Sequence, residues 1–212
     1  MRRNNIKGLC LILDEDLLRV PAESAMSSAI AAGVRFFQYR NKKADRRHTY
    51  DVALRLAILA RESGVLFIVN DHPDIALAAG ADGVHLGQDD LPIDIARKVL
   101  GSEKIIGIST HSQEQACEAQ YHGADYVGFG PVFPTTTKDA GALQGVEKVG
   151  LIRKCLSIPI LAIGGINRGN VSDVMAAGAD GVAVISAILS APDIKEASAE
   201  LAKAAQRIQG EA

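Results

Sequence analysis

The sequence contains no tryptophan, and its other aromatic residues are five phenylalanines and four tyrosines in 212 residues. So few aromatic side chains argue against the stacking surfaces that bind single-stranded nucleic acids. Neither sign of charge is in excess, since 23 lysines and arginines face 25 aspartates and glutamates, for a net charge of −2. The chain therefore lacks the basic surface that unspecific nucleic-acid binding requires, and we expect no nucleic-acid partner.

Cysteine is also scarce. Cys10, Cys117 and Cys155 are odd in number, widely spaced and without a C-x-x-C pair. This spacing matches neither a disulfide framework nor a zinc site. We expect all three to be small, buried apolar residues.

Long hydrophobic runs are missing as well. The first apolar run, residues 8–13, is too short for a signal-peptide core and meets three acidic residues at once. The longest uncharged stretch lies between Lys154 and Arg168 and is shorter than the ~18 residues of a membrane helix. The sequence predicts a soluble, cytoplasmic protein with no membrane partner.

The sequence does contain an internal repeat. The hexapeptide Ala-Gly-Ala-Asp-Gly-Val occurs at 79–84 and again at 177–182, with a weaker copy at 123–127. Each copy ends a helical pattern and opens a β-rich run, and its glycine suits the left-handed residue that closes a helix.

Apolar runs alternate along the chain with amphipathic stretches of helix length, which is typical of parallel βαβ units. Eight strands are predicted, at 9–13, 35–39, 66–70, 83–87, 105–109, 126–130, 160–164 and 182–186. Helices are predicted at 22–32, 46–62, 74–79, 92–100, 112–122, 145–156, 168–177 and 193–209. Eight such units close a (β/α)8 TIM barrel, here a single domain over residues 1–212. A doubly wound open sheet is the alternative, but it usually has five or six strands, and no G-x-G-x-x-G follows the first strand.

Polar residues follow the predicted strands at their carboxyl ends, where barrel enzymes carry their active sites. They are Gln38 to Lys42, Asn70 to His72, Gln88 to Asp90, Ser109 to His111, Pro134 to Lys138, Gly164-Gly165 and Ile185-Ser186. The opposite turns carry little beyond alanine, glycine and aspartate. The sequence therefore predicts one site at this end, and the long Pro131–Gly145 connection is expected to serve it.

Three cations, Arg40, Lys42 and Lys138, converge on the predicted site. Asp71 and Asp90 close consecutive strands and together suit Mg²⁺, the usual partner of carboxylates and substrate phosphates. Cations with Mg²⁺ point to a diphosphate substrate. The alternatives are a solvated strand end for Arg40 and Lys42, and helix caps for Asp71 and for one of Asp89 and Asp90.

A second anion site is predicted at Gly164-Gly165 and Ser186, after the last two strands, where barrels often bind phosphate. Turn chemistry is the alternative for the glycines. His85, inside a strand, is expected to be a packed, hydrogen-bonded histidine rather than a base.

These residues resemble the thiamine phosphate synthases over nearly the whole chain. The motifs are Gln38-x-Arg40-x-Lys42, Asn70-Asp71, His85-Leu86-Gly87-Gln88-Asp89-Asp90, Gly107-Ile108-Ser109, Gly128-x-Gly130-Pro131-Val132-Phe133-Pro134-Thr135-Thr136-Thr137-Lys138, Ile163-Gly164-Gly165-Ile166 and Ile185-Ser186. His72 departs from the family, which often has arginine there.

The resemblance implies Mg²⁺-dependent condensation of hydroxymethylpyrimidine diphosphate with thiazole ethyl phosphate, releasing pyrophosphate by a dissociative route. It implies that the pyrimidine diphosphate is held by Gln38, Tyr39, Arg40, Asn41, Lys42, Asn70, Ser109 and Lys138. Of these, Arg40, Lys42, Ser109 and Lys138 are the expected catalytic residues. The thiazole phosphate would be held by Thr135, Thr136, Thr137, Gly165, Ile185 and Ser186, and Mg²⁺ by Asp71 and Asp90.

Three other functions are open: a thiazole tautomerase of the same superfamily, a sugar-phosphate barrel enzyme, and a non-catalytic sensor of thiamine precursors. The tautomerase shares the thiazole-phosphate site but has no use for two metal-binding aspartates. A homo-oligomer is possible.

Overall fold

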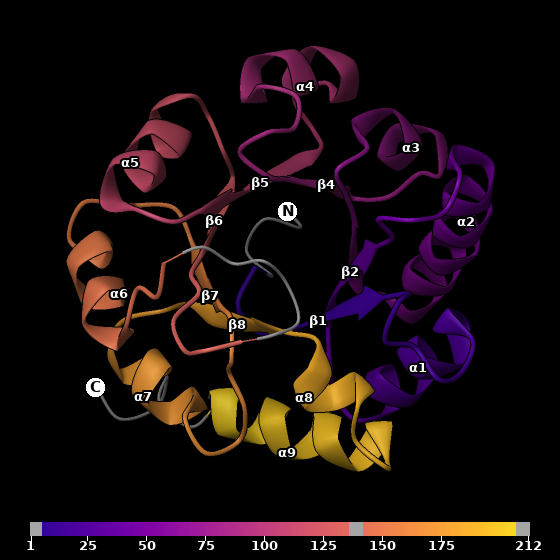
Figure 1. Ribbon diagram of the computed structural model, residues 1–212. Coiled ribbons are helices and arrows are strands. Elements are labelled where there is room, and N and C mark those ends of the chain that lie inside the picture. The colour runs from indigo at the N-terminus through magenta and orange to yellow at the C-terminus, as the bar shows by residue number, and fades with distance from the viewer. Residues whose placement is uncertain (1–5, 136–141, 207–212) are drawn as a thin grey trace.

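A computed structural model describes residues 6–135 and 142–206. Its strands are all parallel and each pairs with the next, and β8 pairs with β1 to close the barrel (Figure 1). The strands are β1 (Gly8–Asp14), β2 (Phe36–Arg40), β3 (Leu66–Asn70), β4 (Gly83–Leu86), β5 (Ile105–Thr110), β6 (Tyr126–Phe129), β7 (Ile160–Ile163) and β8 (Gly181–Val184). The predicted single-domain (β/α)8 barrel is confirmed.

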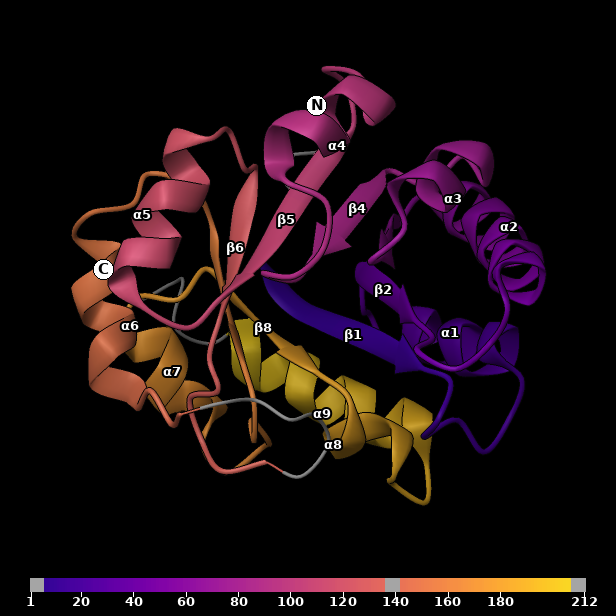
Figure 2. The same cartoon turned by 45° about the horizontal axis from the view of Figure 1, so that its top comes forward.

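Helices form an outer ring around these strands, as the tilted view in Figure 2 also shows. They are α1 (Ala22–Ala31), α2 (Arg46–Ser63), α3 (Pro73–Ala78), α4 (Ile93–Leu100), α5 (Gln113–Tyr121), α6 (Val146–Arg153), α7 (Val171–Ala176), α8 (Ser186–Leu189) and α9 (Ile194–Gln206). Within the described ranges, no helix is long and apolar enough to cross a membrane.

The strands are apolar on both faces because both faces are buried. Inside the barrel, Cys10, Phe36, Ile68, Tyr126 and Leu161 belong to one cluster. The outward side chains pack with the helices in a second and much larger cluster. The period-two alternation of a strand thus separates the residues that fill the barrel from those that hold the helix layer.

The repeat seen in the sequence has a structural role at the amino end of the barrel. Its aspartates accept hydrogen bonds from backbone N–H groups of the preceding strand: Asp82 from Phe67 N at 2.9 Å, Asp125 from Ile106 N at 2.8 Å, and Asp180 from Ile160 N at 2.8 Å. The glycine two residues earlier has φ of 72°, 87° and 102° in the three copies, the left-handed backbone expected after a helix. The repeat therefore closes a helix and fixes the register of two strands.

Several predicted bounds differ from the structure by a few residues, and one of these errors concerns the site. Residues 182–186 were expected to be a strand, but β8 ends at Val184 and Ser186 begins the additional helix α8. Ile185, with φ −123° and ψ −83°, leaves the extended conformation between them. Ile188 and Leu189 are buried, and a short apolar run does not distinguish a buried strand from a buried helical turn.

Candidate active site

A cavity of about 510 Å³ opens at the carboxyl ends of the strands, where the sequence predicted the site. Its lining comprises Ile12, Gln38, Arg40, Asn70, His85, Ser109, His111, Tyr126, Gly128, Pro131, Pro134, Thr135, Leu161, Ile163, Gly164, Gly165, Ile166, Asn167, Ala183, Val184, Ile185, Ser186 and Ala187. A volume of this order is typical of sites for small organic ligands.

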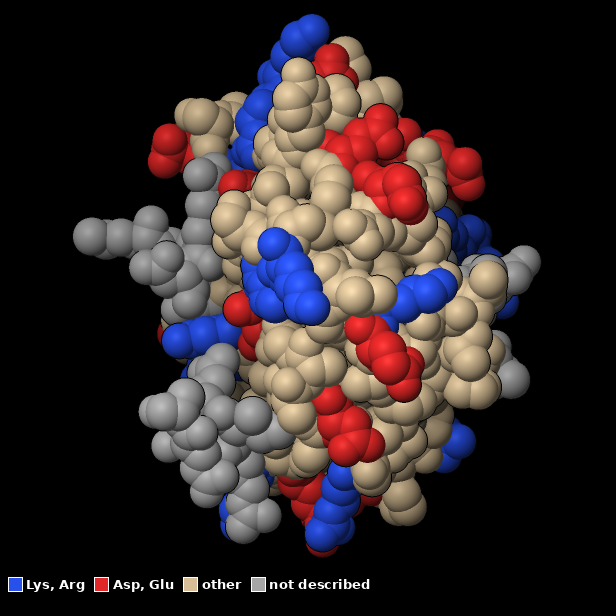
Figure 3. Space-filling view, turned by 90° about the vertical axis from the view of Figure 1, so that its left-hand side faces the viewer, with Lys and Arg blue, Asp and Glu red and all other residues tan. Residues whose placement is uncertain are grey.

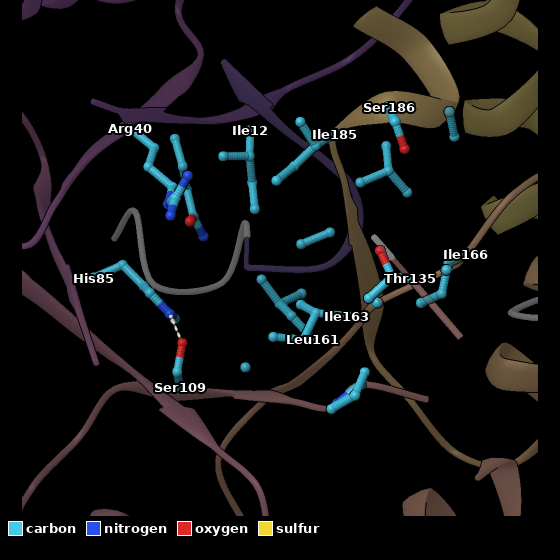
Figure 4. A pocket seen from close by; sticks show the side chains of 18 of the residues that line it. Ile12, Arg40, His85, Ser109, Thr135, Leu161, Ile163, Ile166, Ile185 and Ser186 are labelled. Carbon is cyan, nitrogen blue, oxygen red and sulfur yellow. Dashed lines mark hydrogen bonds between the residues drawn. The ribbon is translucent and has the colours of Figure 1, made fainter. Parts of the chain in front are cut away.

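The cavity has two polar ends and an apolar middle (Figure 4). Arg40, His85 and Ser109 lie on one side, and Thr135 and Ser186 lie on the other. The side chains between them are those of Ile12, Leu161, Ile163 and Ile185. The site can therefore hold polar groups at two separated positions, with apolar or aromatic parts of a ligand between them.

Arg40 is the cation that reaches this cavity from the end of β2. Its guanidinium forms an ion pair with Asp14 at the end of β1, and the two side chains are 13% and 3% exposed. Strand register places the two residues side by side. The buried carboxylate fixes the orientation of the guanidinium and leaves its other N–H groups available to an anionic ligand.

A chain of hydrogen bonds crosses the inside of the barrel from Gln38 to Ser109. Gln38 Nε2 lies 3.1 Å from Tyr126 Oη, which lies 2.8 Å from His85 Nδ1, and His85 Nε2 lies 2.9 Å from Ser109 Oγ. Two glycines make room for these rings. A Cβ at Gly107 would lie 2.0 Å from Tyr126 Cζ, and one at Gly128 would lie 3.1 Å from His85 Cε1.

The direction of this chain follows from Tyr126. Burial raises the pKa of the Tyr126 phenol well above its usual value, so the hydroxyl stays protonated. Since Tyr126 accepts a hydrogen bond from Gln38, it directs its own hydrogen at His85 Nδ1. The His85 Nε2–H group then donates to Ser109, whose hydroxyl hydrogen is left to point into the cavity. The expectation of a packed, hydrogen-bonded His85 is confirmed.

Asn70 adds an acceptor to the same end of the cavity. It lies beside His85 in strand register, and its Oδ1 atom is buried with no hydrogen-bond partner among the described residues. A buried, unpaired acceptor is costly unless a ligand supplies the donor. Asn70 is therefore ready to accept a hydrogen bond from a bound molecule.

Asp71 and Asp90 follow β3 and β4. Lys42 Nζ lies 3.1 Å from Asp71 Oδ2, and Asp90 Oδ2 accepts a hydrogen bond from Gly87 N at 2.6 Å. The N-cap residue of α3 is His72, and that of α4 is Pro92. The helix-cap alternative for the two aspartates is therefore wrong. Asp71 has φ 68°, a left-handed backbone that no other described non-glycine residue adopts.

The donor chemistry of Asp71 and Asp90 can be compared with what a metal ion requires. The described part of the chain has no group of three or more histidine, cysteine, aspartate or glutamate side chains that could enclose an ion. Two carboxylates alone suit Mg²⁺, which keeps several waters and takes substrate phosphates as its other ligands. The donor chemistry at Asp71 and Asp90 is compatible with such an ion.

Tyr39 and Asn41 point away from the cavity, because neighbouring residues of a strand alternate between its faces. The Tyr39 hydroxyl donates to Glu15 Oε2 at 2.6 Å, Asn41 donates to the same atom, and His48 Nε2 lies 2.6 Å from Glu15 Oε1. Burial alone would raise the pKa of Glu15, but these hydrogen bonds outweigh it and lower the pKa. This cluster holds the segment that carries Gln38, Arg40 and Lys42.

The structure thus brings together Gln38, Arg40, Asn70, Ser109, Thr135, Gly165, Ile185 and Ser186 around one cavity. Of the described site residues, Tyr39, Asn41, Lys42, Asp71 and Asp90 are not part of its lining. Thr136, Thr137 and Lys138 lie outside the described residues.

Sequence reasoning missed several lining residues, above all Tyr126, and it named His111 only as part of the strand-end segment 109–111 without giving it a role. His111 Nδ1 lies 2.6 Å from Gly130 O. Tyr126 begins a strand, where only its buried character could be expected. A signal for its place was available in Gly107, since a glycine inside a buried strand often makes room for a bulky neighbour.

Together, the closed barrel and its two-ended polar cavity define a (β/α)8-barrel enzyme that binds its substrates at the carboxyl ends of the strands. Residues 9–188 match the model of the family described as thiamine monophosphate synthase. The chain belongs to this family, and it is a transferase of thiamine biosynthesis.

Individual relatives agree with this assignment. The chain is 48% identical over 195 residues to thiamine-phosphate synthase of Chloroflexus aurantiacus, covering 91% of this chain and 90% of that protein. It is 44% identical over 191 residues to thiamine-phosphate synthase of Moorella thermoacetica, covering 90% and 91%. The solved structure of thiamine phosphate pyrophosphorylase from Pyrococcus furiosus superposes with a TM-score of 0.90 at 40% identity, covering 99% of this chain and 100% of that one.

Proposed function

We propose that the protein joins hydroxymethylpyrimidine diphosphate to thiazole ethyl phosphate, giving thiamine phosphate and pyrophosphate. The thiazole nitrogen forms a bond to the pyrimidine methylene carbon, and the bond from that carbon to the diphosphate oxygen breaks. The observation that carries the proposal is the cavity with two polar ends and an apolar middle, which suits two phosphorylated substrates whose rings meet between them.

The end that carries Ser109 and Asn70 suits the pyrimidine. An aminopyrimidine presents a ring nitrogen, which accepts a hydrogen bond, beside an amino group, which donates one. Ser109 offers a hydroxyl hydrogen directed by His85, and Asn70 Oδ1 offers a buried acceptor without a protein partner. Arg40 lies at the same end for the diphosphate.

The opposite end suits the thiazole phosphate. Thr135 and Ser186 bring side-chain hydroxyls to it, and Gly165 exposes backbone close to the loop after β6. A Cβ at Gly165 would lie 2.4 Å from Pro134 O, so only glycine lets the two loops approach this closely. We assign Thr136 and Thr137 to the same phosphate on the motif that they share with Thr135.

Asp71 and Asp90 would hold Mg²⁺ in this proposal. The ion would neutralise charge on the diphosphate and so favour its departure. Lys42, which pairs with Asp71, would add positive charge near the diphosphate. Arg40 and Lys138 would supply the remaining positive charge.

The reaction we infer is dissociative. The thiazole nitrogen attacks through a lone pair and has no proton to lose, so the step needs no general base. In this proposal, Arg40, Lys42, Lys138 and Mg²⁺ would stabilise the charge of the leaving group, which favours early breakage of the C–O bond. The apolar residues between the two ends limit the access of water to a pyrimidine cation.

Release of pyrophosphate tests the proposal. Purified protein with Mg²⁺ should release it only when both substrates are present, and omission of either one should abolish the signal. A thiazole tautomerase, the other candidate, would instead convert the thiazole phosphate alone. Conversion of that compound without the pyrimidine, and without pyrophosphate, would overturn the proposal in favour of the tautomerase.

A further inference from the structure

Two of the three cysteines form a pair that the reaction does not use. Cys117 lies on α5 and Cys155 follows α6, and their sulfur atoms are 3.2 Å apart although 38 positions separate them in the chain. The Cys117 thiol donates to the Cys155 sulfur, and the Cys155 thiol donates to Ile152 O at 3.2 Å. Both side chains are half-buried, whereas Cys10 is fully buried inside the barrel.

The expectation that all three cysteines are small, buried apolar residues therefore holds for Cys10 alone. Partial exposure gives the other two access to small solutes, and their mutual contact means that a reaction at one sulfur has the second within reach. Neither sulfur belongs to the lining of the cavity among the described residues. The pair is a separate feature of the outer helix layer.

Helices α5 and α6 are neighbours on the left-hand side of Figure 1. Figure 3 faces this side of the molecule and shows lysines, arginines, aspartates and glutamates interspersed over it, with broad uncharged areas between them. No charge of one sign dominates the visible face. The visible face therefore shows no cluster of one charge that would select a charged reagent.

We propose that Cys117 and Cys155 are a redox-responsive site, which takes up a low-molecular-weight disulfide as oxidant and closes to a reversible intramolecular disulfide. One cysteine thiolate attacks a sulfur of the small disulfide and releases one small thiol, which leaves a mixed disulfide on the protein. The other cysteine thiolate attacks the protein sulfur of that mixed disulfide and releases the second small thiol. Each cysteine sulfur loses one electron, the two small sulfurs gain them, and the cysteine protons end on the released thiols.

The exchange is expected to be slow. The hydrogen bond between Cys117 and Cys155 raises the pKa of the Cys117 thiol, and burial and the charge of Glu114 raise it further. Little thiolate is therefore present near neutral pH. The carboxylate of Glu114 also disfavours the approach of an anionic oxidant. A neutral disulfide should therefore react faster than an anionic one such as oxidised glutathione.

Formation of the bond would tie α5 to the end of α6. The chain between the two cysteines contains β6 with Tyr126, and the start of the loop that carries Thr135. A crosslink across a stretch of this length restricts the unfolded chain and raises stability, by about 5–10 °C in Tm if the native geometry accepts it. A bound metal is a poorer explanation, because a structural zinc needs four ligands and the described residues supply no third one beside these sulfurs.

The test uses the native, reduced protein and 2-hydroxyethyl disulfide, a small neutral oxidant. After exposure and denaturation, one of the three cysteines should still react with an alkylating agent, the protein should have lost two hydrogens in mass, and a proteolytic digest should contain a peptide linking Cys117 to Cys155. Dithiothreitol should restore all three thiols and the original Tm. Cys10→Ala, the matched control, should form the same linked peptide.

Three results would overturn the proposal. The first is that all three thiols stay reactive in excess oxidant. The second is that the product is a stable mixed disulfide at one cysteine, and the third is that the crosslink joins two chains. Cys117→Ser and Cys155→Ser should each lose the linked peptide and the rise in Tm, but the result on the unmodified protein decides the matter even if a variant folds poorly.

Discussion

The Nε2 atom of His85 lies 2.9 Å from the Oγ atom of Ser109, and the hydrogen bond runs between neighbouring strands of the barrel. His85 is 7% exposed and Ser109 4%. Because Tyr126 occupies the other ring nitrogen, the histidine is held as a donor rather than available as a base. In the proposed reaction, His85 would orient the serine hydroxyl toward the pyrimidine substrate.

We therefore expect His85 to be a positioning residue, and the kinetics of single and double variants can test this. Ser109→Ala should lower kcat by about 100-fold or more, since one preorganised donor is lost. His85→Ala should lower kcat by about 10–100-fold through misorientation of that donor. The double variant should be no slower than Ser109→Ala, because both substitutions remove the same interaction.

Steady-state kinetics of the three variants check this prediction, with His85→Gln as the conservative replacement. Its amide nitrogen can still donate to Ser109 and should recover part of kcat. His122→Ala, at an exposed position after α5, serves as the control and should leave kcat unchanged. Losses that simply multiply in the double variant would show that His85 acts independently of Ser109.

The proposed metal site predicts a change in the requirement for Mg²⁺. Asp71→Asn and Asp90→Asn each remove one anionic ligand and should raise the Mg²⁺ concentration for half-maximal activity by about 10-fold or more. Asp89→Asn is a matched control, because Asp89 is exposed beside Asp90. Initial rates over a range of Mg²⁺ concentrations give the measurement, and normal Mg²⁺ curves for both single variants would reject the assignment.

A dissociative reaction predicts strong sensitivity to the electronics of the pyrimidine. Replacing its methyl group with trifluoromethyl withdraws electrons from the developing cation, and each ~1.4 kcal/mol of lost stabilisation costs tenfold in rate. We expect single-turnover rates to fall by several orders of magnitude. A nearly normal rate with this analogue would indicate direct displacement.

Lys138→Ala should lower kcat more than it raises KM for the thiazole phosphate, because the proposed role of the lysine is to stabilise the departing pyrophosphate. Steady-state rates over a range of thiazole phosphate concentrations separate the two constants. A variant that changes KM alone would instead place Lys138 on the thiazole phosphate.

The Glu15 cluster predicts a pH-dependent contribution to stability. Hydrogen bonds from Tyr39, His48 and Asn41 lower the pKa of Glu15 from its usual value of 4.5. A depressed carboxyl pKa stabilises the folded protein above the unfolded-state value, and that stabilisation is lost as pH falls through the lower, folded-state value. Glu15→Gln should therefore reduce the free energy of unfolding by about 1 kcal/mol near neutral pH, and the difference should shrink below pH 4.5.

Urea denaturation at several pH values measures this difference. Glu62→Gln, at an exposed position near the end of α2, should show no comparable loss. A difference between the wild type and Glu15→Gln that stays constant with pH would exclude a contribution from the charge.

The barrel could be predicted from the sequence because its signals are local. The repeated Ala-Gly-Ala-Asp-Gly-Val segments mark where helices end and strands begin, and Asp82, Asp125 and Asp180 then take equivalent places between strands. The position of Gln38, Arg40, Asn70 and Ser109 around one cavity follows from the rule that strand ends meet at one end of the barrel.

The rest depends on contacts between distant residues. The strand pattern marks Tyr126 as buried, but it does not say that Gly107 leaves space for its ring or that Gln38 reaches its hydroxyl. In the same way, nothing in the spacing of Cys117 and Cys155 indicates that the packing of α5 against α6 brings their sulfurs together. The sequence predicts a strand that ends at Ser186 because the apolar run before it has the pattern of a buried strand.

Asp71 keeps a backbone conformation that glycine adopts without strain and that asparagine tolerates well. Holding an aspartate there costs on the order of 1 kcal/mol, which the fold must supply from elsewhere. Stability alone would thus favour glycine at position 71, and the proposed binding of Mg²⁺ is a reason to keep a carboxylate there. If that proposal holds, a descendant of this barrel that lost the activity would be expected to change at this position early and to become more stable.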